Sequence, residues 1–300
     1  MKIMICDPTS ADAIEAIRAA GHDVDVRDDI SAEDLPAAIP AYHGIVVRSR
    51  TKVREPLIDV AENLKVIVRG GVGLDNIAVD YARARGIAVL NTPAASTQSV
   101  AELTVGYFFA LARRIPQMTA SMKAGLWEKK KFKGAEIAGK TLGLVGVGRI
   151  GTAVAERAKA LGMTVIAYDP YVKEWALGEL VNLDALLEQA DYISMHLPHT
   201  DETHHIIDAA AIARMKEGVR IVNCARGGVI DEDALYDGIT AGKVAGAALD
   251  VFAEEPCKGH KLFELDEVLG SPHVGAGTKE ATDRVGAEVA EKMVGFFKEN

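Results

Sequence analysis

Short apolar runs alternate with helix-like patterns along nearly the whole chain. In the first third the apolar runs are KIMIC, DVDVR, GIVVRS, KVIVRG and IAVLN. Between them lie segments such as ADAIEAIRAAG and VDYARARG, with apolar positions at helical spacing and a glycine at the end. Strands that alternate with helices in this way predict a parallel sheet covered by helices on both faces.

A second series of the same kind begins at Lys140, with the apolar runs TLGLVGVG, TVIAYD, YISMHLP, VRIVNCARG and AGAALDVF. The two series predict two α/β domains, which suits 300 residues better than one core.

Residues 100–114, VAELTVGYFFALARR, predict a long and largely buried helix. The loop GLWEKKKFKG that follows is open to different interpretations: it is a solvated surface, or else it is a dimer arm or part of an anion site. The final segment, TKEATDRVGAEVAEKMVGFFKEN, predicts an amphipathic helix that packs back onto the first domain.

Composition narrows the class of protein. A formal net charge of -9 argues against a nucleic-acid binder, because no overall basic field exists to hold phosphates. A small anionic substrate would therefore need a locally basic pocket. No run approaches eighteen apolar residues, and MKIMICDP lacks the pattern of a signal peptide, so we expect neither a membrane span nor a leader. Cys6, Cys224 and Cys257 are scattered without CxxC spacing, which favours a reducing, cytoplasmic location.

The most specific local motif is LGLVGVGRIG, which contains GxGxxG as Gly146, Gly148 and Gly151. It follows a predicted strand and opens a predicted helix, as the dinucleotide-binding mechanism requires. The first glycine makes the tight turn, the second lets the backbone approach a pyrophosphate, and the third allows close helix–strand packing. The helix N-terminus offers its N–H groups to the phosphates. The next strand, TVIAYD, ends in Asp169, which can bind a ribose 2′-hydroxyl and would repel a 2′-phosphate. The motif therefore predicts NAD rather than NADP.

Three further polar residues follow later strands: Arg226 in NCARGG, Glu255 in DVFAEEP and His273 in SPHVGAG. Ligands of open α/β sheets bind beyond the carboxyl ends of the strands, so all three lie where chemistry is expected. Each also has an ordinary structural interpretation. Arg226 could cap a helix or make a surface ion pair, Glu255 could be a solvated turn residue, and His273 could be a structural histidine. The residues by themselves leave these alternatives open.

The chain resembles the D-2-hydroxyacid dehydrogenase family, and within it most closely the branch that acts on D-3-phosphoglycerate. The resemblance covers nearly the whole chain. It is carried, in order, by VVRSRTKV, VRGGVGLDNI, NTP, SVAEL, WEKKKFKG, GKTLGLVGVGRIG, YDP, HLPHTDETHHII, NCARGGVIDEDAL, AGAALDVFAEEP and PHVGAGTKEA. It implies two parallel-sheet α/β domains: a discontinuous, flavodoxin-like substrate-binding domain at 1–95 plus 275–300, and an NAD-binding Rossmann domain at 96–274.

The resemblance also implies a catalytic trio of Arg226, Glu255 and His273. Arg226 would be a bidentate donor to a carboxylate and the neighbouring oxygen. His273 would remove the hydroxyl proton while the 2-carbon gives hydride to the nicotinamide, and Glu255 would orient the imidazole and stabilise its charged form.

Further positions carry over from the family where the residues match. The resemblance implies that cofactor contacts come from Val72, Arg149, Ile150, Leu197, Cys224, Ala225, Asp250, Gly275 and Ala276. Val72 replaces a polar residue often found there, which puts a side-chain contact in doubt. Cys224 is interpreted as a small neutral wall residue rather than a nucleophile. The substrate carboxylate would meet the backbone of Gly71 and Val72, and its phosphate would meet Arg48 and Arg69, unless these arginines make ion pairs between domains. Lys129, Lys130 and Lys131 could add charge from a partner subunit.

The implied function is NAD-dependent oxidation of D-3-phosphoglycerate to 3-phosphohydroxypyruvate, at the entry to serine synthesis. Two alternatives remain: a glyoxylate or hydroxypyruvate reductase or another D-2-hydroxyacid dehydrogenase, and a non-catalytic NAD-sensing protein like the C-terminal binding protein corepressors. A formate dehydrogenase would carry glutamine in place of Glu255.

The sequence also bears on metals, oligomerisation and regulation. No metal is expected, because a regular zinc spacing is lacking among the histidines His196, His199, His204 and His205. The family implies a homodimer through the helix at 100–114 and its lysine loop. The chain stops after the last family helix, so we expect no serine feedback through a C-terminal regulatory domain.

Overall fold

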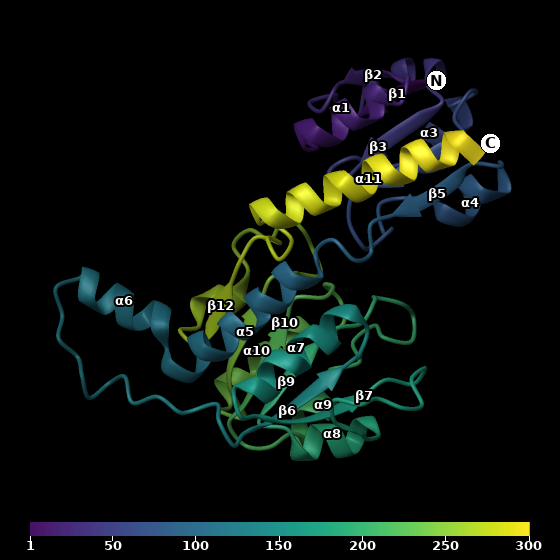
Figure 1. The fold of residues 1–300 in the computed structure, drawn as a ribbon. Coiled ribbons are helices and arrows are strands. Elements are labelled where there is room, and N and C mark those ends of the chain that lie inside the picture. Colours follow the sequence, from purple (N-terminus) through teal and green to yellow (C-terminus); the bar gives the residue numbers. More distant parts are fainter. Residues whose placement is uncertain (300) are drawn as a thin grey trace. The chain divides into compact units, whose positions relative to one another are not determined.

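The computed structural model describes residues 1–299 and divides them into two compact units, residues 1–96 with 276–299, and Thr97–Gly275. Each unit is built on its own parallel sheet (Figure 1). The predicted α/β class with two parallel sheets is therefore confirmed. The unit boundaries lie one residue beyond those expected from the sequence.

The sheet of the first unit has the strand order β2-β1-β3-β4-β5 over the described residues, and every neighbouring pair is parallel. This is the flavodoxin-like order. Each of the five apolar runs in the first third of the sequence contains a strand in the structure. These strands are β1 (Lys2–Ile5), β2 (Asp23–Val26), β3 (Gly44–Val47), β4 (Val66–Arg69) and β5 (Ala88–Asn91).

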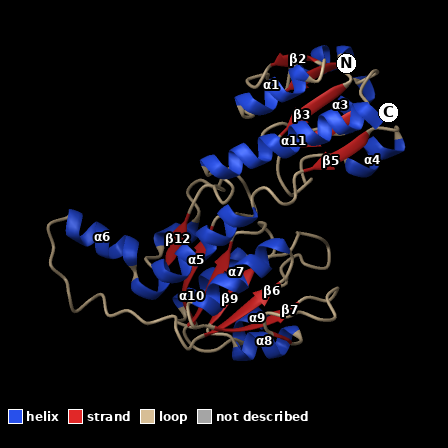
Figure 2. Cartoon of the chain, in the orientation of Figure 1, coloured by secondary structure: helices blue, strands red, loops and turns tan. Residues whose placement is uncertain are grey.

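Helices cover both faces of this sheet. On one face α1 packs against α11, and α11 also contacts β4, so the amphipathic C-terminal helix returns to the first unit (Figures 1 and 2). The apolar stripe of α11 buries Val285, Val289 and Met293. The opposite face holds the short helices between β2 and β5. The helices of this unit are α1 (Ala11–Ala19), α2 (Leu35–Ala38), α3 (Glu55–Val60), α4 (Val79–Ala84) and α11 (Lys279–Glu299), with a 3-10 turn η1 (Ile39–Ala41).

The sheet of the second unit has the order β12-β11-β10-β9-β6-β7-β8 over the described residues, again with parallel pairs. The strands β6 to β11 follow the Rossmann order, and β12 is added at the edge of the sheet beside β11. The strands are β6 (Thr141–Val145), β7 (Thr164–Tyr168), β8 (Glu179–Leu180), β9 (Tyr192–Met195), β10 (Val219–Asn223), β11 (Val244–Leu249) and β12 (Val268–Gly270).

Two apolar clusters hold the second sheet between its helices. One cluster joins the sheet to α5 and α7, and the other joins it to α8, α9 and α10. The helix predicted at 100–114 is α5, whose buried side includes Val100, Tyr107 and Phe108. The helices are α5 (Thr97–Arg113), α6 (Ile115–Lys123), α7 (Arg149–Ala160), α8 (Leu183–Gln189), α9 (Ala209–Arg214) and α10 (Glu232–Thr240), with a 3-10 turn η2 (Lys261–Glu264).

An arm formed by α6 and the loop 124–134 projects from the second unit (Figure 1). Arg114 adopts a left-handed backbone conformation, with φ of 52°, which separates α6 from α5. Large apolar side chains of the arm are exposed to solvent: Trp127 is 81% exposed, Met122 56% and Leu126 49%. Within residues 1–299, none of the helices has the length and apolar character needed to cross a membrane.

Candidate active site

The glycine-rich loop follows β6 and leads into α7. Gly146 has φ of 98°, and a Cβ there would lie 2.5 Å from the carbonyl oxygen of His196. A Cβ on Gly151 would lie 2.3 Å from the carbonyl oxygen of Gly146. A Cβ on Gly148, in contrast, would meet no protein atom within 4 Å. The first and third glycines are therefore required by the fold, whereas the second leaves open space against the backbone, as a bound pyrophosphate needs.

The surroundings of this loop also suit a dinucleotide. Helix α7 begins at Arg149, and its N-cap, Gly148, makes no side-chain capping hydrogen bond. The N–H groups of the first turn can therefore bind phosphate. Asp169, directly after β7, accepts the N–H of Val147 at 3.0 Å and the N–H of Tyr171 at 3.0 Å. The carboxylate thus lies against the glycine-rich loop, where a ribose hydroxyl would bind. The residues present fit NAD.

His273 and Glu255 form a hydrogen-bonded pair in the second unit. His273 Nδ1 lies 2.8 Å from Oε2 of Glu255, and the side chains are 43% and 36% exposed. The other carboxylate oxygen, Oε1, accepts the N–H of Phe252 at 3.1 Å. His273 adopts a left-handed backbone conformation with φ of 53°, which is rare for a residue other than glycine and is common at functional sites. Glu255 therefore fixes the imidazole so that Nε2 is the nitrogen available to a substrate.

The loop that carries His273 is held by Asp250, a residue expected from the sequence only as a cofactor contact. Asp250 is 1% exposed. Its carboxylate accepts the N–H of Val274 at 2.8 Å, the N–H of Gly275 at 2.7 Å and the hydroxyl of Ser271. Ser271 in turn accepts the hydroxyl of Tyr107 on α5 at 2.6 Å. The sequence did not predict this hydrogen-bond network, because Tyr107 lies in a predicted buried helix, where its side chain is expected to be an ordinary core residue.

The loop NCARGG packs closely against the loop after β11. A Cβ on Gly227 would lie 1.8 Å from the carbonyl oxygen of Phe252, so only glycine fits. Phe252 thus contacts the loop of Arg226 through its carbonyl group and Glu255 through its N–H. The Arg226 guanidinium donates to the carbonyl oxygen of Ala225 at 2.6 Å, and the Arg226 carbonyl accepts from Asn223 at 2.8 Å. Arg226, Glu255 and His273 follow three neighbouring strands, β10, β11 and β12, at one edge of the sheet.

Cys224 directly follows β10 and is 7% exposed. Burial raises the pKa of its thiol to about 12, so the side chain is a neutral thiol at physiological pH. A nucleophile would need the opposite shift. The residues Leu197 and Ala225, which were expected to line the cofactor with it, are partly buried and pack on the apolar cluster of the second unit.

In the first unit, Arg48 and Arg69 lie at the carboxyl ends of neighbouring strands. Val47 and Arg69 are paired in the register of β3 and β4, and Arg48 follows Val47 directly. The Arg69 guanidinium donates to the hydroxyl of Ser49 at 3.2 Å. It also lies over Gly71, which has φ of 145° and whose Cβ position is 1.7 Å from Nη1 of Arg69. The Val72 carbonyl accepts from the amide of Asn91. The first unit therefore gathers two cations and the RGGV turn at one sheet edge.

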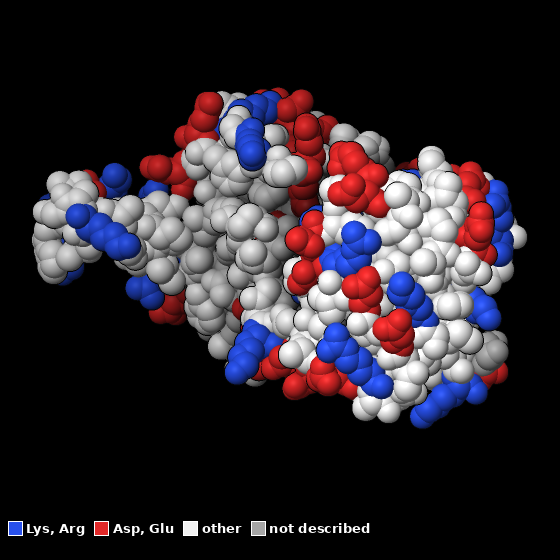
Figure 3. All heavy atoms as spheres, turned by 90° about the horizontal axis from the view of Figure 1, so that it is seen from above, with Lys and Arg blue, Asp and Glu red and all other residues white. Residues whose placement is uncertain are grey.

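Basic side chains elsewhere do not form a continuous field on the face shown in Figure 3, where Lys and Arg are interspersed with Asp and Glu.

The histidines after β9 contact one another. His199 and His204 are hydrogen-bonded at 3.0 Å, and the ring of His204 stacks on that of His205 with 3.9 Å between the ring centroids. Within residues 1–299, no three His, Cys, Asp or Glu side chains converge in a way that could hold a metal ion.

Comparison with known proteins gives a consistent result. Residues 105–275 match the family model described as D-isomer specific 2-hydroxyacid dehydrogenase, NAD binding domain. A D-3-phosphoglycerate dehydrogenase of Methanocaldococcus jannaschii is 51% identical over 98% of this chain and 57% of that protein. A hydroxypyruvate reductase of Thermotoga maritima is 48% identical over 99% of this chain and 98% of that protein. This chain therefore spans little more than half of the first relative and nearly all of the second.

Among solved structures, the D-lactate dehydrogenase of Aquifex aeolicus complexed with NAD and lactic acid superposes with a TM-score of 0.87 at 31% identity. The alignment covers 100% of this chain and 96% of that one. The similarity therefore extends over both units and not only over the part that matches the family model.

Proposed function

The chain belongs to the D-isomer specific 2-hydroxyacid dehydrogenase family, and from this premise we propose that it oxidises D-3-phosphoglycerate to 3-phosphohydroxypyruvate with NAD. The observation that carries the reaction class is the 2.8 Å contact between His273 and Glu255. The loops that carry this pair and the glycine-rich loop follow strands of the same parallel sheet, at its carboxyl edge. A proton acceptor in the NAD-binding unit is what the oxidation of a hydroxyl group requires.

In the proposed reaction, Arg226 binds the substrate carboxylate and the 2-oxygen through its planar guanidinium. His273 accepts the hydroxyl proton at Nε2 as the 2-carbon loses its hydride. The imidazolium that forms is stabilised by Glu255 at Nδ1, and Glu255 is itself held by the N–H of Phe252. When bound, NAD supplies the hydride acceptor. In the reverse direction His273 returns the proton to the oxygen.

The choice of a phosphorylated substrate rests on the first unit, which we propose as the substrate-binding domain. Arg48 and Arg69 place two positive charges at adjacent strand ends, beside the backbone of Gly71. A phosphate group is an acceptor that suits such an arginine pair. The name of the Methanocaldococcus jannaschii relative favours the same substrate. The name of the Thermotoga maritima relative, which this chain covers almost completely, favours hydroxypyruvate reduction as the second candidate.

We also propose that NAD is preferred over NADP, because Asp169 would repel a 2′-phosphate. The exposed apolar side chains of the arm, Met122, Leu126 and Trp127, support a homodimer in which they are covered by a second subunit. The role in serine synthesis and the cytoplasmic location are parts of the same proposal.

The test is NADH formation from D-3-phosphoglycerate, with D-glycerate and D-lactate in parallel and NADP in place of NAD. Hydroxypyruvate and glyoxylate reduction are followed in the same preparation. Strong preference for the phosphorylated acid supports the proposal, whereas equal rates with the unphosphorylated acids favour a general 2-hydroxyacid enzyme. Absence of turnover in both directions, with NADH still bound, would favour a corepressor-like, non-catalytic protein.

Two variants test whether Arg48 and Arg69 bind the phosphate group of the substrate. Arg48→Gln and Arg69→Gln are each expected to raise KM for D-3-phosphoglycerate about 10-fold to 100-fold, because a hydrogen bond to a charged group contributes about 1.5–3 kcal/mol. They should leave KM for D-glycerate unchanged. Arg85→Gln is the matched control, since Arg85 is a half-exposed arginine of the same unit that pairs with Asp59.

A further inference from the structure

We propose that Asp7 is a positioning residue for anion binding, because it holds the loop Arg48–Thr51 in the conformation that presents Arg48. This inference rests on the proposed function. Asp7 lies two residues after the end of β1, at the carboxyl edge of the first sheet, and it is 1% exposed. A carboxylate at such a depth is retained only where partners compensate its charge.

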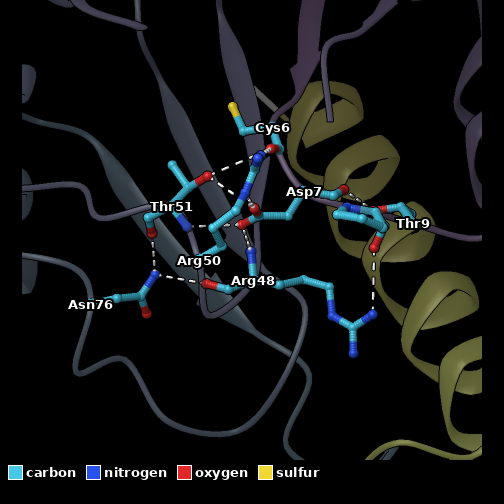
Figure 4. A network of polar contacts seen from close by, with 8 residues as sticks. Cys6, Asp7, Thr9, Arg48, Arg50, Thr51 and Asn76 are labelled. Atoms are coloured by element: carbon cyan, nitrogen blue, oxygen red, sulfur yellow. Dashed lines mark hydrogen bonds and ion pairs between the residues drawn. The ribbon is translucent and has the colours of Figure 1, made fainter. Parts of the chain in front are cut away.

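Both oxygens of Asp7 are used by this one loop (Figure 4). Oδ2 accepts the N–H of Arg48 and, at 3.3 Å, the N–H of Thr51. Oδ1 accepts Nε of Arg50 at 2.9 Å and the hydroxyl of Thr51 at 3.0 Å. One buried side chain therefore fixes the first, third and fourth residues of the turn that follows β3.

The contacts give different roles to the two arginines of the sequence RSR. The guanidinium of Arg50 turns to Asp7 and also donates to the carbonyl oxygen of Cys6, so its charge is offset. Arg48 is bound to Asp7 only through its backbone, while its guanidinium lies 3.4 Å from the carbonyl oxygen of Pro8 (Figure 4). Among residues 1–299, Arg48 makes no ion pair. The loop thus keeps the net positive charge of Arg48 for an anion.

The other side of the loop is held by Asn76. Its amide donates to the carbonyl oxygens of Arg48 at 2.8 Å and of Thr51 at 2.6 Å (Figure 4). The stem of Arg48 passes over Gly70, where a Cβ would lie 3.3 Å from its Cγ. The backbone of the anion-binding turn is therefore fixed before a ligand arrives, which reduces the ordering cost of binding. Loss of the carboxylate should weaken binding of the phosphate group and leave the hydride-transfer step unaffected.

The experiment compares Asp7→Asn, Arg50→Gln and the double variant, with KM and kcat measured for D-3-phosphoglycerate and for D-glycerate. Asp7→Asn is expected to raise KM for D-3-phosphoglycerate about tenfold or more, since hydrogen bonds to a charged group are lost. We expect kcat, KM for NAD and KM for D-glycerate to change less than about twofold. Arg50→Gln leaves the carboxylate uncompensated beside the anion site, so the double variant should be less impaired than the product of the single effects predicts.

Asp59→Asn is the matched control, because Asp59 forms an ion pair with Arg85 in the same unit and is half exposed. If Asp7→Asn does not fold, Thr51→Val removes one donor to Asp7 from a side chain that is 8% exposed and keeps its shape. That variant should raise the same KM several-fold. An unchanged KM for D-3-phosphoglycerate, or equal losses with both substrates and with NAD, would overturn the inference.

Hydrogen exchange separates this inference from the proposed function. Asp7→Asn should speed exchange at the amides of Arg48 and Thr51, which donate to Asp7. If wild-type protein does not prefer D-3-phosphoglycerate over D-glycerate, the proposed substrate is wrong. Faster exchange would then still support the positioning of the loop by Asp7. Unchanged exchange at both amides would show that Asp7 does not hold the loop, whatever the substrate is.

Discussion

His273 Nδ1 lies 2.8 Å from Oε2 of Glu255, and Oε1 of the same carboxylate is bound by the N–H of Phe252. His273, the proposed acid–base residue, is therefore oriented by a side chain that is itself hydrogen-bonded to the backbone. Phe252 also contacts the loop of Arg226, at the carbonyl oxygen that excludes a side chain from Gly227. Phe252 thus links the positions of the three residues that are proposed to be catalytic.

Replacement of His273 by asparagine is expected to lower kcat by about 10²–10⁴-fold, the usual contribution of general acid–base catalysis. Glu255→Gln should cause a smaller loss, because an amide still accepts from Nδ1 but does not stabilise the imidazolium. NADH affinity, measured by fluorescence titration, should stay within about twofold of wild type in both variants. A comparable loss of NADH binding would show instead that the pair maintains the structure of the cofactor site.

Asp169 is expected to set the choice between NAD and NADP. Asp169→Ser replaces the charged acceptor for the ribose 2′-hydroxyl with a neutral hydroxyl and removes the charge that repels a 2′-phosphate. The ratio of kcat/KM for NAD over NADP should fall about 10-fold to 100-fold, from a hydrogen bond to a charged group of about 1.5–3 kcal/mol. Asp201→Ser provides a control at an exposed acidic residue of the loop after β9. An unchanged ratio in Asp169→Ser would place cofactor selection elsewhere.

The sequence predicted the elements that depend on local pattern. Every strand predicted in the two α/β series is present. Most are apolar runs buried in a parallel sheet, whereas β2, with the exposed residues Asp23 and Val26, lies at the edge of its sheet. The placement of Arg226, Glu255 and His273 at one sheet edge could be predicted because the carboxyl ends of parallel strands meet there, whereas their catalytic roles were implied only by the resemblance to the family. In contrast, β8 has two residues, Glu179 and Leu180, and forms only by pairing with β7, so no local pattern marks it.

The roles of residues that act through contacts far apart in the chain could not be predicted from the sequence. Asp7 reads as a turn residue before Pro8, and its role depends on partners 41 to 44 positions away. Asp250 was expected only at the cofactor, because its contacts to Ser271, Val274 and Gly275 depend on the pairing of β11 with β12. In both cases a buried carboxylate gathers backbone N–H groups from another loop, and only the tertiary structure reveals which loop that is.

The glycines of the cofactor loop should respond differently to alanine. Gly148→Ala introduces a Cβ with no protein atom within 4 Å, at φ of -63°, so thermal stability should be unchanged. NADH binding should weaken at least tenfold, because the methyl group occupies the path of the pyrophosphate. Gly151→Ala places a Cβ 2.3 Å from the Gly146 carbonyl oxygen and should lower the melting temperature. Calorimetry and NADH titration of both variants check this; normal NADH binding by Gly148→Ala would contradict the proposed pyrophosphate site.

His196 is expected to make the stability of the chain depend on pH. Its Nε2 lies 2.9 Å from the hydroxyl of Ser194, and its Nδ1 is buried. Burial lowers the pKa of His196 from 6.5 to about 3, because the charged imidazole would lose its hydration. Between these two values the unfolded chain binds more protons than the folded one, so this contribution favours folding above pH 6.5 and is lost as the pH falls.

The size of this effect can be isolated by comparison with His196→Gln. Acidification from pH 7 to pH 5 should cost the wild type up to about 2 kcal/mol of unfolding free energy from this one group, from about 1.4 kcal/mol per pH unit below 6.5. The variant lacks the titrating ring, so its stability should fall less over the same range. His204→Gln, at a side chain whose ring nitrogen Nδ1 bonds His199 on the surface, is the control and should follow the wild type. Urea denaturation at both pH values provides the measurement. Parallel losses in wild type and His196→Gln would mean that the ring is hydrated in the folded protein and that its pKa is not lowered by burial.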